Sequence, residues 1–268
     1  MMRLPGAISE DDQILARIEQ ALDMSGSILS DYTPGRVEAT AKAGGDPVTE
    51  ADLAVDAALR KLLPAAGDGW LSEESVREPQ RLQERNLWVV DPIDGTKEFV
   101  SGIPEWCVSI GYVENGTAVA GGIFNPASGE TILGSLRSGV WRNGERVTVS
   151  RTSVLSDAVV LASRSEVGRG EWASFMNGAV RVRPTGSVAY KLGLVAAGRA
   201  DATWTLTPKS EWDVAAGVAL VRAAGGEVRT LDWRTPRFNN EPPVFDGLVA
   251  CNATLLQPIG ELLELPAT

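Results

Sequence analysis

The pattern of apolar and polar positions changes character near the middle of the chain. In the first half, two stretches repeat apolar residues every three or four positions and predict amphipathic helices over Ser9–Leu29 and Thr49–Leu63. Each opens with a hydroxyl residue followed three positions later by an aspartate, Asp12 or Asp52, a pattern typical of helix starts. Pro64 is expected to end the second helix, since proline cannot continue the hydrogen-bond ladder.

Asn-Gly pairs predict two β-hairpins later in this half, because both residues tolerate the left-handed backbone of a tight turn. The pairs lie at 115–116 and 143–144. The expected strands are Val108–Val113, Thr117–Phe124, Thr131–Leu136 and Val140–Val149. Two segments lack a regular pattern: Gly44–Pro47 predicts a loop, and the charged stretch Glu73–Asn86 predicts a solvated, mobile connection.

After residue 150 the pattern alternates between strand-like and helix-like segments, which is typical of α/β organisation. The expected strands are Val159–Ala162, Val180–Arg183, Ala200–Thr205, Glu227–Leu231 and Val244–Ala250. The expected helices are Trp172–Met176, Ser187–Ala197, Val214–Ala224 and Leu255–Leu265. We therefore expect an α+β part over 1–150 with a largely antiparallel sheet, and an α/β part over 151–268. A length of 268 residues fits one large domain or two that pack closely.

Composition narrows the classes of partner. The net charge of −10 and the pI near 4.7 argue against a nucleic-acid polymer or an anionic membrane as partner, because either would need a basic face. No stretch of 18 apolar residues and no signal peptide is evident, so a cytoplasmic protein is expected. Cys107 and Cys251 lie in apolar contexts and predict buried free thiols.

The chain contains no histidine. Its absence excludes Ser-His-Asp and Cys-His nucleophile systems, HExxH zinc sites and acid–base catalysis by histidine. Hydrolytic chemistry in this chain must therefore use carboxylates, hydroxyls, lysines or water activated by a metal ion.

The run Asp91-Pro-Ile-Asp-Gly-Thr-Lys-Glu-Phe99 is the most informative segment of the chain. The apolar residues Leu87–Val90 before it predict a buried strand that stops where the acids begin. The proline excludes helix there, and the turn can bring Asp91, the Ile93 carbonyl and Asp94 together. Two carboxylates so close repel each other unless a proton or a cation intervenes, and Mg²⁺ prefers such oxygen ligands. The alternative is an ordinary surface turn.

Two weaker signals flank this run. Glu73 and Glu74 follow the short apolar segment Trp70-Leu-Ser, and Asp213 lies in Glu211-Trp-Asp-Val-Ala-Ala-Gly217, at the start of a helix of small residues. Taken singly, a double glutamate is typical of a solvated face, and an aspartate at a helix start is typical of a cap.

Together, the Ser-Glu-Glu, Asp-Pro-Ile-Asp-Gly-Thr and Trp-Asp-Val-Ala-Ala-Gly segments resemble the inositol monophosphatase superfamily of metal-dependent, lithium-sensitive phosphomonoesterases. All three signatures occur here in order, and the resemblance spans at least residues 40–230. It implies the layered αβαβα sandwich of the inositol monophosphatase and fructose-1,6-bisphosphatase type, which combines α+β and α/β features. It also implies a small phosphorylated substrate, attacked directly by metal-activated water.

The resemblance assigns roles to individual residues. It implies that two or three Mg²⁺ ions are held by Glu73, Asp91, the Ile93 carbonyl, Asp94 and Asp213. Asp94, Gly95 and Thr96 would bind the phosphate, with Gly95 and Thr96 at a helix N-terminus. Asp52 and Thr96 would orient and deprotonate the attacking water beside Glu73. For Asp52 the alternative is a helix cap that bonds back to Thr49, and both roles are compatible.

The continuation Lys97-Glu98-Phe99 looks like the CysQ-like 3′(2′),5′-bisphosphate nucleotidase branch, since inositol monophosphatases usually continue with x-Asn-Phe. Leu206 occupies the place where inositol phosphatases carry a glutamate that contacts inositol. Lys191, after Gly186-Ser187, and Lys209 could instead meet a second phosphate, with Arg164 as a further candidate.

The expected reaction is therefore hydrolysis of the 3′-phosphate of adenosine 3′,5′-bisphosphate to AMP and phosphate. The alternatives are an inositol-1-monophosphatase or broad-specificity sugar phosphatase and, more remotely, a non-catalytic metal- or phosphate-binding regulator. The presence of every ligand and of the water-activating pair argues against the regulator. The sequence leaves the oligomeric state open, a homodimer included.

Overall fold

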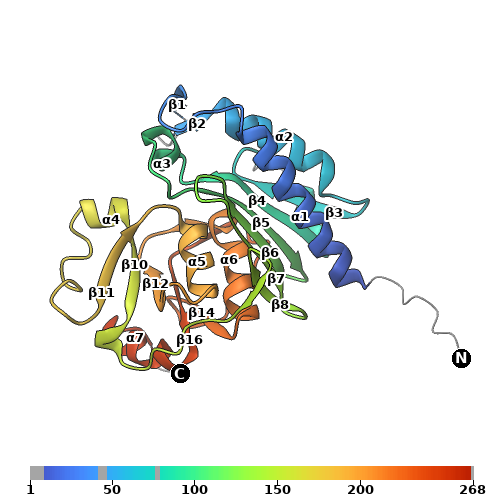
Figure 1. Cartoon of the computed structure of the whole chain (residues 1–268). Coiled ribbons are helices and arrows are strands. Elements are labelled where there is room, and N and C mark those ends of the chain that lie inside the picture. The colour runs from blue at the N-terminus through green and yellow to red at the C-terminus, as the bar shows by residue number, and fades with distance from the viewer. Residues whose placement is uncertain (1–8, 42–46, 76–78, 267–268) are drawn as a thin grey trace, which may run out of the picture.

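The computed structural model describes residues 9–41, 47–75 and 79–266. Most of the loop predicted at Gly44–Pro47 lies outside these residues. Figure 1 shows five layers, in which helices and sheets alternate as α, β, α, β, α. The layered αβαβα architecture expected from the sequence is therefore confirmed.

The larger sheet has seven strands, and only the pair formed by its first two strands is parallel. In spatial order its strands are β3 (Asp68–Ser72), β4 (Asn86–Asp94), β5 (Cys107–Glu114), β6 (Thr117–Asn125), β7 (Glu130–Ser135), β8 (Gly139–Arg142) and β9 (Glu145–Val147). Asn115 and Asn143 have φ of 48° at their Asn-Gly turns, so both predicted turns are confirmed. The segment predicted as one strand, Val140–Val149, is divided by the second turn into β8 and β9.

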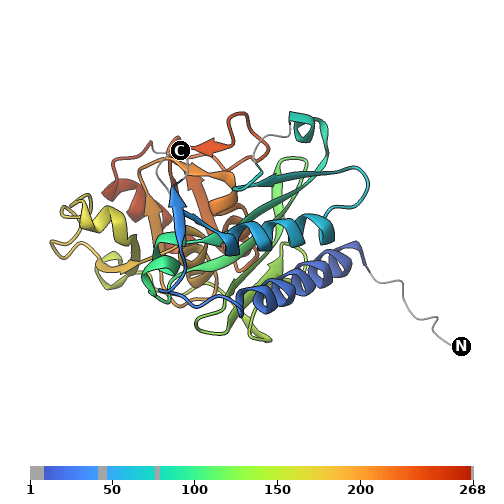
Figure 2. The same ribbon diagram turned by 90° about the horizontal axis from the view of Figure 1, so that it is seen from above.

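Helices cover both faces of this sheet, which explains why β4 is apolar without alternation. On one face, Trp88 and Val90 of β4 pack with the first two helices, α1 (Glu10–Leu29) and α2 (Glu50–Leu62). On the other face, Leu87 and Val89 join the core formed with α5 (Val188–Ala196) and α6 (Glu211–Ala223). Figure 2 shows α1 and α2 lying side by side over the sheet.

The first two helices begin where the sequence predicts. The Ser9 hydroxyl accepts a hydrogen bond from the Asp12 amide at the start of α1. A reciprocal capping box joins Thr49 and Asp52 at the start of α2, which ends at Leu62, just before Pro64. These hydrogen bonds satisfy amide groups that a helix start would otherwise leave without partners.

Helices α5 and α6 form the middle layer and contact both sheets. Their approach to each other and to the larger sheet is close because glycines lie at the contact points. A Cβ on Gly121 of β6 would lie 2.5 Å from the Ala216 carbonyl oxygen of α6. A Cβ on Gly217 of α6 would lie 2.3 Å from the Leu192 Cβ of α5. No side chain fits at either position without displacing its neighbour.

The second sheet has five strands and mixes parallel with antiparallel pairs. In spatial order they are β11 (Arg181–Thr185), β10 (Val159–Ser163), β12 (Ala202–Thr205), β16 (Leu248–Asn252) and β14 (Gly226–Thr230). Helix α7 (Leu256–Leu262) and the short α4 (Arg164–Gly168) lie outside it (Figure 1). The boundary predicted near residue 150 stays a prediction, and the middle helices pack against strands from both sides of it.

Short elements complete the described chain. They are the strands β1 (Ala39–Ala41), β2 (Pro47–Thr49), β13 (Lys209–Ser210) and β15 (Val244–Phe245), the helix α3 (Thr96–Ser101), and the 3₁₀ turns Pro79–Gln83, Leu155–Asp157 and Ala253–Leu255. Both cysteines are buried and free, as expected. No helix within the described residues is long and apolar enough to cross a membrane.

The helix predicted at Trp172–Met176 is wrong. These residues form turns, and the nearby helix is α4, which lies earlier in the chain and is capped by Ser163. The Trp172 ring stacks on Trp204, with centroids 4.9 Å apart, and its indole donates to Glu166. Tertiary packing of the aromatic residues therefore overrides the local helical pattern.

The solvated connection predicted over Glu73–Asn86 is also wrong in part. Arg81 is only 2% exposed, and its guanidinium donates to the Asn239 side chain, the Asn240 carbonyl and Glu241. The charged composition of the segment gives no sign that Arg81 is buried, because its hydrogen-bond partners lie far along the chain.

We expect Gly121→Ala to destabilise the protein by about 1–3 kcal/mol, because the added methyl overpacks the contact between β6 and α6. Gly168→Ala is the matched control, since a Cβ there meets nothing within 4 Å. It should leave stability within about 1 kcal/mol of the original. Urea unfolding of both variants measures the difference, and equal stabilities would contradict the close approach.

Candidate functional site

A cavity of ≈ 380 Å³ opens where β4 and α3 face α5 and the start of α6. Its walls are mostly polar. The lining residues are Pro47, Glu73, Asp91, Ile93, Asp94, Gly95, Thr96, Lys97, Glu98, Ser163, Ser165, Gly186, Ser187, Val188, Lys191, Pro208, Lys209, Ser210, Trp212 and Asp213. The cavity thus brings together residues from all three signature segments.

The strand carrying the first acids is longer than predicted. Strand β4 continues to Asp94, which pairs with Cys107 of β5, and the register shifts between Asp91 and Asp94. The Ile93 amide donates to Asp91 Oδ1 at 3.0 Å, so a local bulge takes the place of the expected chain turn. The prediction that the strand stops where the acids begin is therefore wrong, because the pairing with β5 continues through Asp91 to Asp94.

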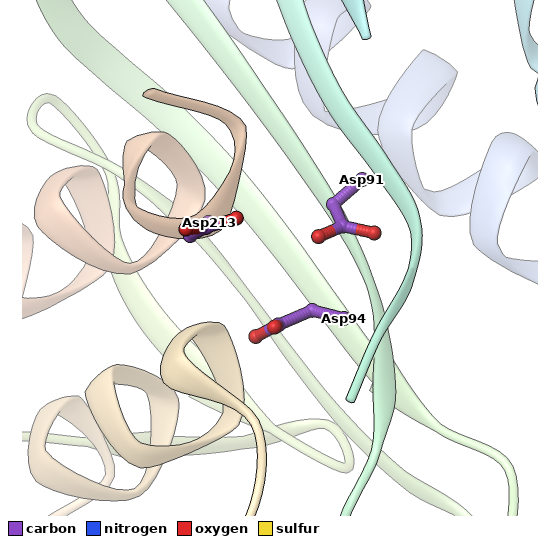
Figure 3. Close-up of side chains that lie close together, drawn as sticks. All are labelled: Asp91, Asp94 and Asp213. Atoms are coloured by element: carbon purple, nitrogen blue, oxygen red, sulfur yellow. The ribbon is translucent and has the colours of Figure 1, made fainter. Parts of the chain in front are cut away.

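The third acid comes from the middle layer. Asp213 occupies the first turn of α6, where its Oδ2 accepts the Ser210 amide at 3.0 Å in a capping box. The cap and the predicted ligand role are compatible, since the hydrogen bond fixes the position of the carboxylate. Figure 3 shows Asp91 and Asp94 on β4 facing Asp213 across a narrow gap.

Asp91, Asp94 and Asp213 each offer an oxygen, and these oxygens lie within 4.8 Å of one another. Burial raises the pKa of Asp91 well above its ordinary value, and repulsion from Glu73, Asp94 and Asp213 raises it further. Burial followed by repulsion from Asp94 and Glu73 likewise raises the pKa of Asp213. A set of carboxylate oxygens from two buried aspartates and a half-buried one fits a hard divalent cation such as Mg²⁺, which would reduce this repulsion.

Asp94 is held by the start of α5. Its Oδ2 accepts the Ser187 hydroxyl at 2.6 Å and also the Ala189 amide. Burial raises the pKa of Asp94, while these hydrogen bonds and the charges of Lys191 and Lys209 oppose that rise. The hydroxyl of Ser187, a residue predicted to bind substrate, therefore donates a hydrogen bond to Asp94, an acid of the cluster.

The predicted water-activating pair is in contact. Thr96 Oγ1 lies 3.4 Å from Asp52 Oδ1 and 2.9 Å from the Ile93 carbonyl oxygen. Asp52 Oδ2 accepts the amide and hydroxyl of Thr49 at 2.8 Å and 2.6 Å. Asp52 does not line the cavity, but its capping box fixes it behind Thr96, which does.

Gly95 precedes the six-residue helix α3 with a φ of 97°. A Cβ there would lie 3.1 Å from the Glu105 carbonyl oxygen and from Trp106 Cβ, so both the conformation and the packing favour glycine. The Gly95-Thr96 pair is thereby placed on the cavity wall beside the acids.

The two predicted lysines both line the cavity. Lys191 is 4% exposed, and burial lowers its pKa, while Asp94 and Glu166 act to raise it. Arg164 differs from expectation: it does not line the cavity and pairs with Glu105. Leu206 is 47% exposed and also lies outside the lining.

Sequence reasoning missed the residues that shape the wall around Gly186. The Gly186 amide donates to Glu105 Oε2 at 2.7 Å, and a Cβ on Gly186 would lie 2.5 Å from the Glu98 side chain. In the sequence, Glu98 is part of the segment that resembles the bisphosphate nucleotidase branch. In the structure it is buried and lines the cavity. No local signal could reveal these contacts, which join segments far apart in the chain.

Comparisons with known proteins agree with this geometry. Residues 10–261 match the inositol monophosphatase family. The chain is 37% identical to a Thermotoga maritima protein named fructose-1,6-bisphosphatase/inositol-1-monophosphatase, over 86% of this chain and 90% of that protein.

Two solved structures have the same fold. An inositol monophosphatase from Anabaena superposes with a TM-score of 0.78 at 29% identity, covering 95% of this chain and 96% of its own. CysQ from Bacteroides thetaiotaomicron, a bacterial member of the inositol monophosphatase family, gives 0.77 at 28% identity, covering 92% and 99%. With a family match over nearly its whole length and the three acids of the signatures gathered in one cavity, this chain belongs to the inositol monophosphatase family.

Proposed function

We propose that this protein is a Mg²⁺-dependent phosphomonoesterase that hydrolyses the 3′-phosphate of adenosine 3′,5′-bisphosphate to AMP and phosphate. The observation that carries the proposal is the cavity itself, whose lining combines the carboxylate cluster with two lysines, Lys191 and Lys209. A substrate with two phosphates can use both the metal ligands and the lysines.

The metal ligands in this proposal are Asp91, Asp94 and Asp213, together with Glu73 and the Ile93 carbonyl, all of which line the cavity. When bound, Mg²⁺ neutralises charge on the phosphate ester and makes a nearby water more acidic. A protein of net charge −10 repels an anionic substrate at long range, so local cations must offset that repulsion.

Asp52 and Thr96 are the proposed water-activating pair. The Thr96 hydroxyl can pass its proton to Asp52 while it accepts a proton from the attacking water, so Asp52 takes up the proton and hydroxide is left to attack. Two donors from Thr49 hold the other oxygen of Asp52, so the carboxylate stays oriented toward Thr96. Gly95 and Thr96 would bind the reacting phosphate from the backbone of the wall.

Lys191 and Lys209 support the choice of a bisphosphate. Both come from the α/β half, and both lie close enough to Asp94 to influence its pKa, so they lie within a short distance of the reaction centre. The exposed apolar side chain of Leu206 could not accept a hydrogen bond from an inositol hydroxyl.

A second candidate is an inositol monophosphatase. The names of the Thermotoga maritima relative and of the Anabaena structure favour it. It would use the same acids and the same water-activating pair, and it differs only in what the lysine side of the cavity contacts.

The substrate is tested by measuring Mg²⁺-dependent phosphate release from adenosine 3′,5′-bisphosphate, myo-inositol 1-phosphate and fructose 1,6-bisphosphate side by side. We expect the highest kcat/KM for the adenosine ester, because the inositol ester has no second phosphate for the lysines and fructose 1,6-bisphosphate carries its second phosphate on a different skeleton. A clear preference for the inositol ester would overturn the nucleotidase and favour the second candidate.

Asp52→Asn should lower kcat by about 10²–10⁴-fold, because the amide cannot take up the proton while it keeps a hydrogen-bonding oxygen. Asp12→Asn makes the same change in the cap of α1, away from the cavity, and should leave kcat unchanged. Steady-state kinetics of both variants test the role of Asp52. Full activity of Asp52→Asn would assign the residue to capping alone.

Saturating Mg²⁺ should raise Tm by about 5–10 °C, since a ligand at a hundredfold its Kd adds about 2.7 kcal/mol to stability. Asp91→Asn should abolish most of that rise, and calorimetric scans with and without Mg²⁺ measure it. The exposed Asp246→Asn serves as control and should keep the full rise.

Without Mg²⁺, Asp91→Asn should be more stable than the original chain at neutral pH, because it removes repulsion within the cluster. Folding raises the pKa of Asp91 above its ordinary value of 3.8, so the folded chain binds the proton more tightly. The contribution of protonated Asp91 to the free energy of unfolding is fully present below pH 3.8. It is lost as the pH rises through the pKa of Asp91 in the folded chain. The advantage of the variant should therefore shrink as the pH falls from 7 toward 3.8. A constant advantage would contradict the raised pKa.

A further inference from the structure

Glu166 is a buried carboxylate in contact with Lys209, which lines the cavity. It lies in α4, is 3% exposed, and does not itself line the cavity. Its Oε2 accepts the Trp172 indole at 3.0 Å. Its Oε1 accepts the hydroxyls of Thr205 at 2.8 Å and Thr207 at 3.1 Å, and Lys209 Nζ lies 3.4 Å from the same oxygen.

These contacts make Glu166 a fixed negative charge. Burial by itself would raise the pKa of Glu166, but the hydrogen bonds from Trp172 and Thr205 and the charges of Lys209 and Lys191 outweigh it and lower the pKa. The Trp172 ring is stacked on Trp204 of β12, so the donor at one side is anchored in the core of the second sheet. Both the charge and the position of the carboxylate are therefore set by packing.

Lys209 is held by two of its neighbours and still reaches the cavity. Its ammonium donates to Thr207 Oγ1 at 3.1 Å and forms the ion pair with Glu166. An ammonium has three donors, so one remains to point at a ligand in the cavity that Lys209 lines. A lysine anchored in this way loses less side-chain freedom when it binds an anion than a freely rotating lysine does.

The contacts with Glu166 and Thr207 also oppose the electrostatic attraction of Lys209 toward the acid cluster. Lys209 interacts with the charges of both Asp94 and Asp213, and without another partner it would be drawn toward them. There it would compete with a metal ion for the same oxygens. Glu166, whose Oε1 lies 3.4 Å from the ammonium, supplies a competing attraction.

We propose that Glu166 is a positioning residue that, with Thr207, holds Lys209 against the second sheet so that its free donor meets the non-reacting phosphate of the substrate. The inference rests on the proposed function and deepens it: the pair Glu166–Lys209 makes the site selective for an ester that carries a second phosphate. Glu166 acts through Lys209 and does not touch the substrate.

The test compares adenosine 3′,5′-bisphosphate with adenosine 3′-monophosphate, which lacks the second phosphate. The measured quantity is the ratio of the two kcat/KM values, with kcat and KM recorded separately. In Glu166→Gln we expect this ratio to fall about three- to tenfold, mainly through KM for the bisphosphate, because the lysine must be ordered on binding. A purely structural role would lower both kcat/KM values together and leave the ratio unchanged, which would overturn the proposal.

Thr207→Val provides a second variant that keeps the buried carboxylate and removes the hydroxyl that accepts from Lys209. The ratio should fall in this variant too, so the proposal stays testable if Glu166→Gln fails to fold. Glu171→Gln is the matched control, since Glu171 lies in the same segment, pairs with Arg169 and faces solvent. Its ratio should equal that of the original chain.

Lys209→Met separates this inference from the proposed function. If the original chain shows no preference for the bisphosphate, the proposed function fails. If that preference exists and falls in Lys209→Met but persists in the variants of Glu166 and Thr207, only the positioning role fails. A loss of preference in all three variants supports both.

Discussion

Repulsion among buried carboxylates is the constraint on which the site depends. Asp91, Asp94 and Asp213 lie close together although burial raises the pKa of each, and repulsion from neighbouring carboxylates raises the pKa of Asp91 and Asp213 further. Such an arrangement forms only if the surrounding packing is rigid. The bulged end of β4, a capping box at α6 and two donors from α5 to Asp94 supply that rigidity.

The middle layer connects this constraint to the rest of the molecule. Helices α5 and α6 approach each other through Gly217, and α6 approaches the larger sheet through Gly121, so small changes in spacing would move Asp213 relative to β4. The same two helices pack against the second sheet. A site assembled from the first sheet, the middle layer and the edge of the second sheet therefore needs all three to keep their distances.

The charge distribution follows from the same arrangement. The chain carries a net charge of −10, yet Lys191 and Lys209 are among the residues that line the cavity. Glu166 competes with the acid cluster for Lys209, so these lysines and the acid cluster share one cavity. The position of Lys209 relative to the acids depends on Glu166, and the Glu166 carboxylate is held by the indole of Trp172, which stacks on Trp204.

The sequence by itself determined the local features of this protein. Capping patterns at Ser9 and Thr49, turns at Asn115 and Asn143, and the spacing of acids after Val90 depend on residues a few positions apart. Hydrophobic patterning likewise predicted most of the helices and strands, because burial on one or both faces leaves a periodic signal, whereas the layered arrangement was implied by the resemblance to the family. Only the tertiary structure decided the contacts between distant segments. It extended β4 through Asp91 to Asp94, turned Ser187 toward Asp94, buried Arg81, replaced a predicted helix with the turn that carries Trp172, and paired Glu166 with Lys209. These features arise from hydrogen bonds and packing between segments whose separation along the chain leaves no local pattern to read.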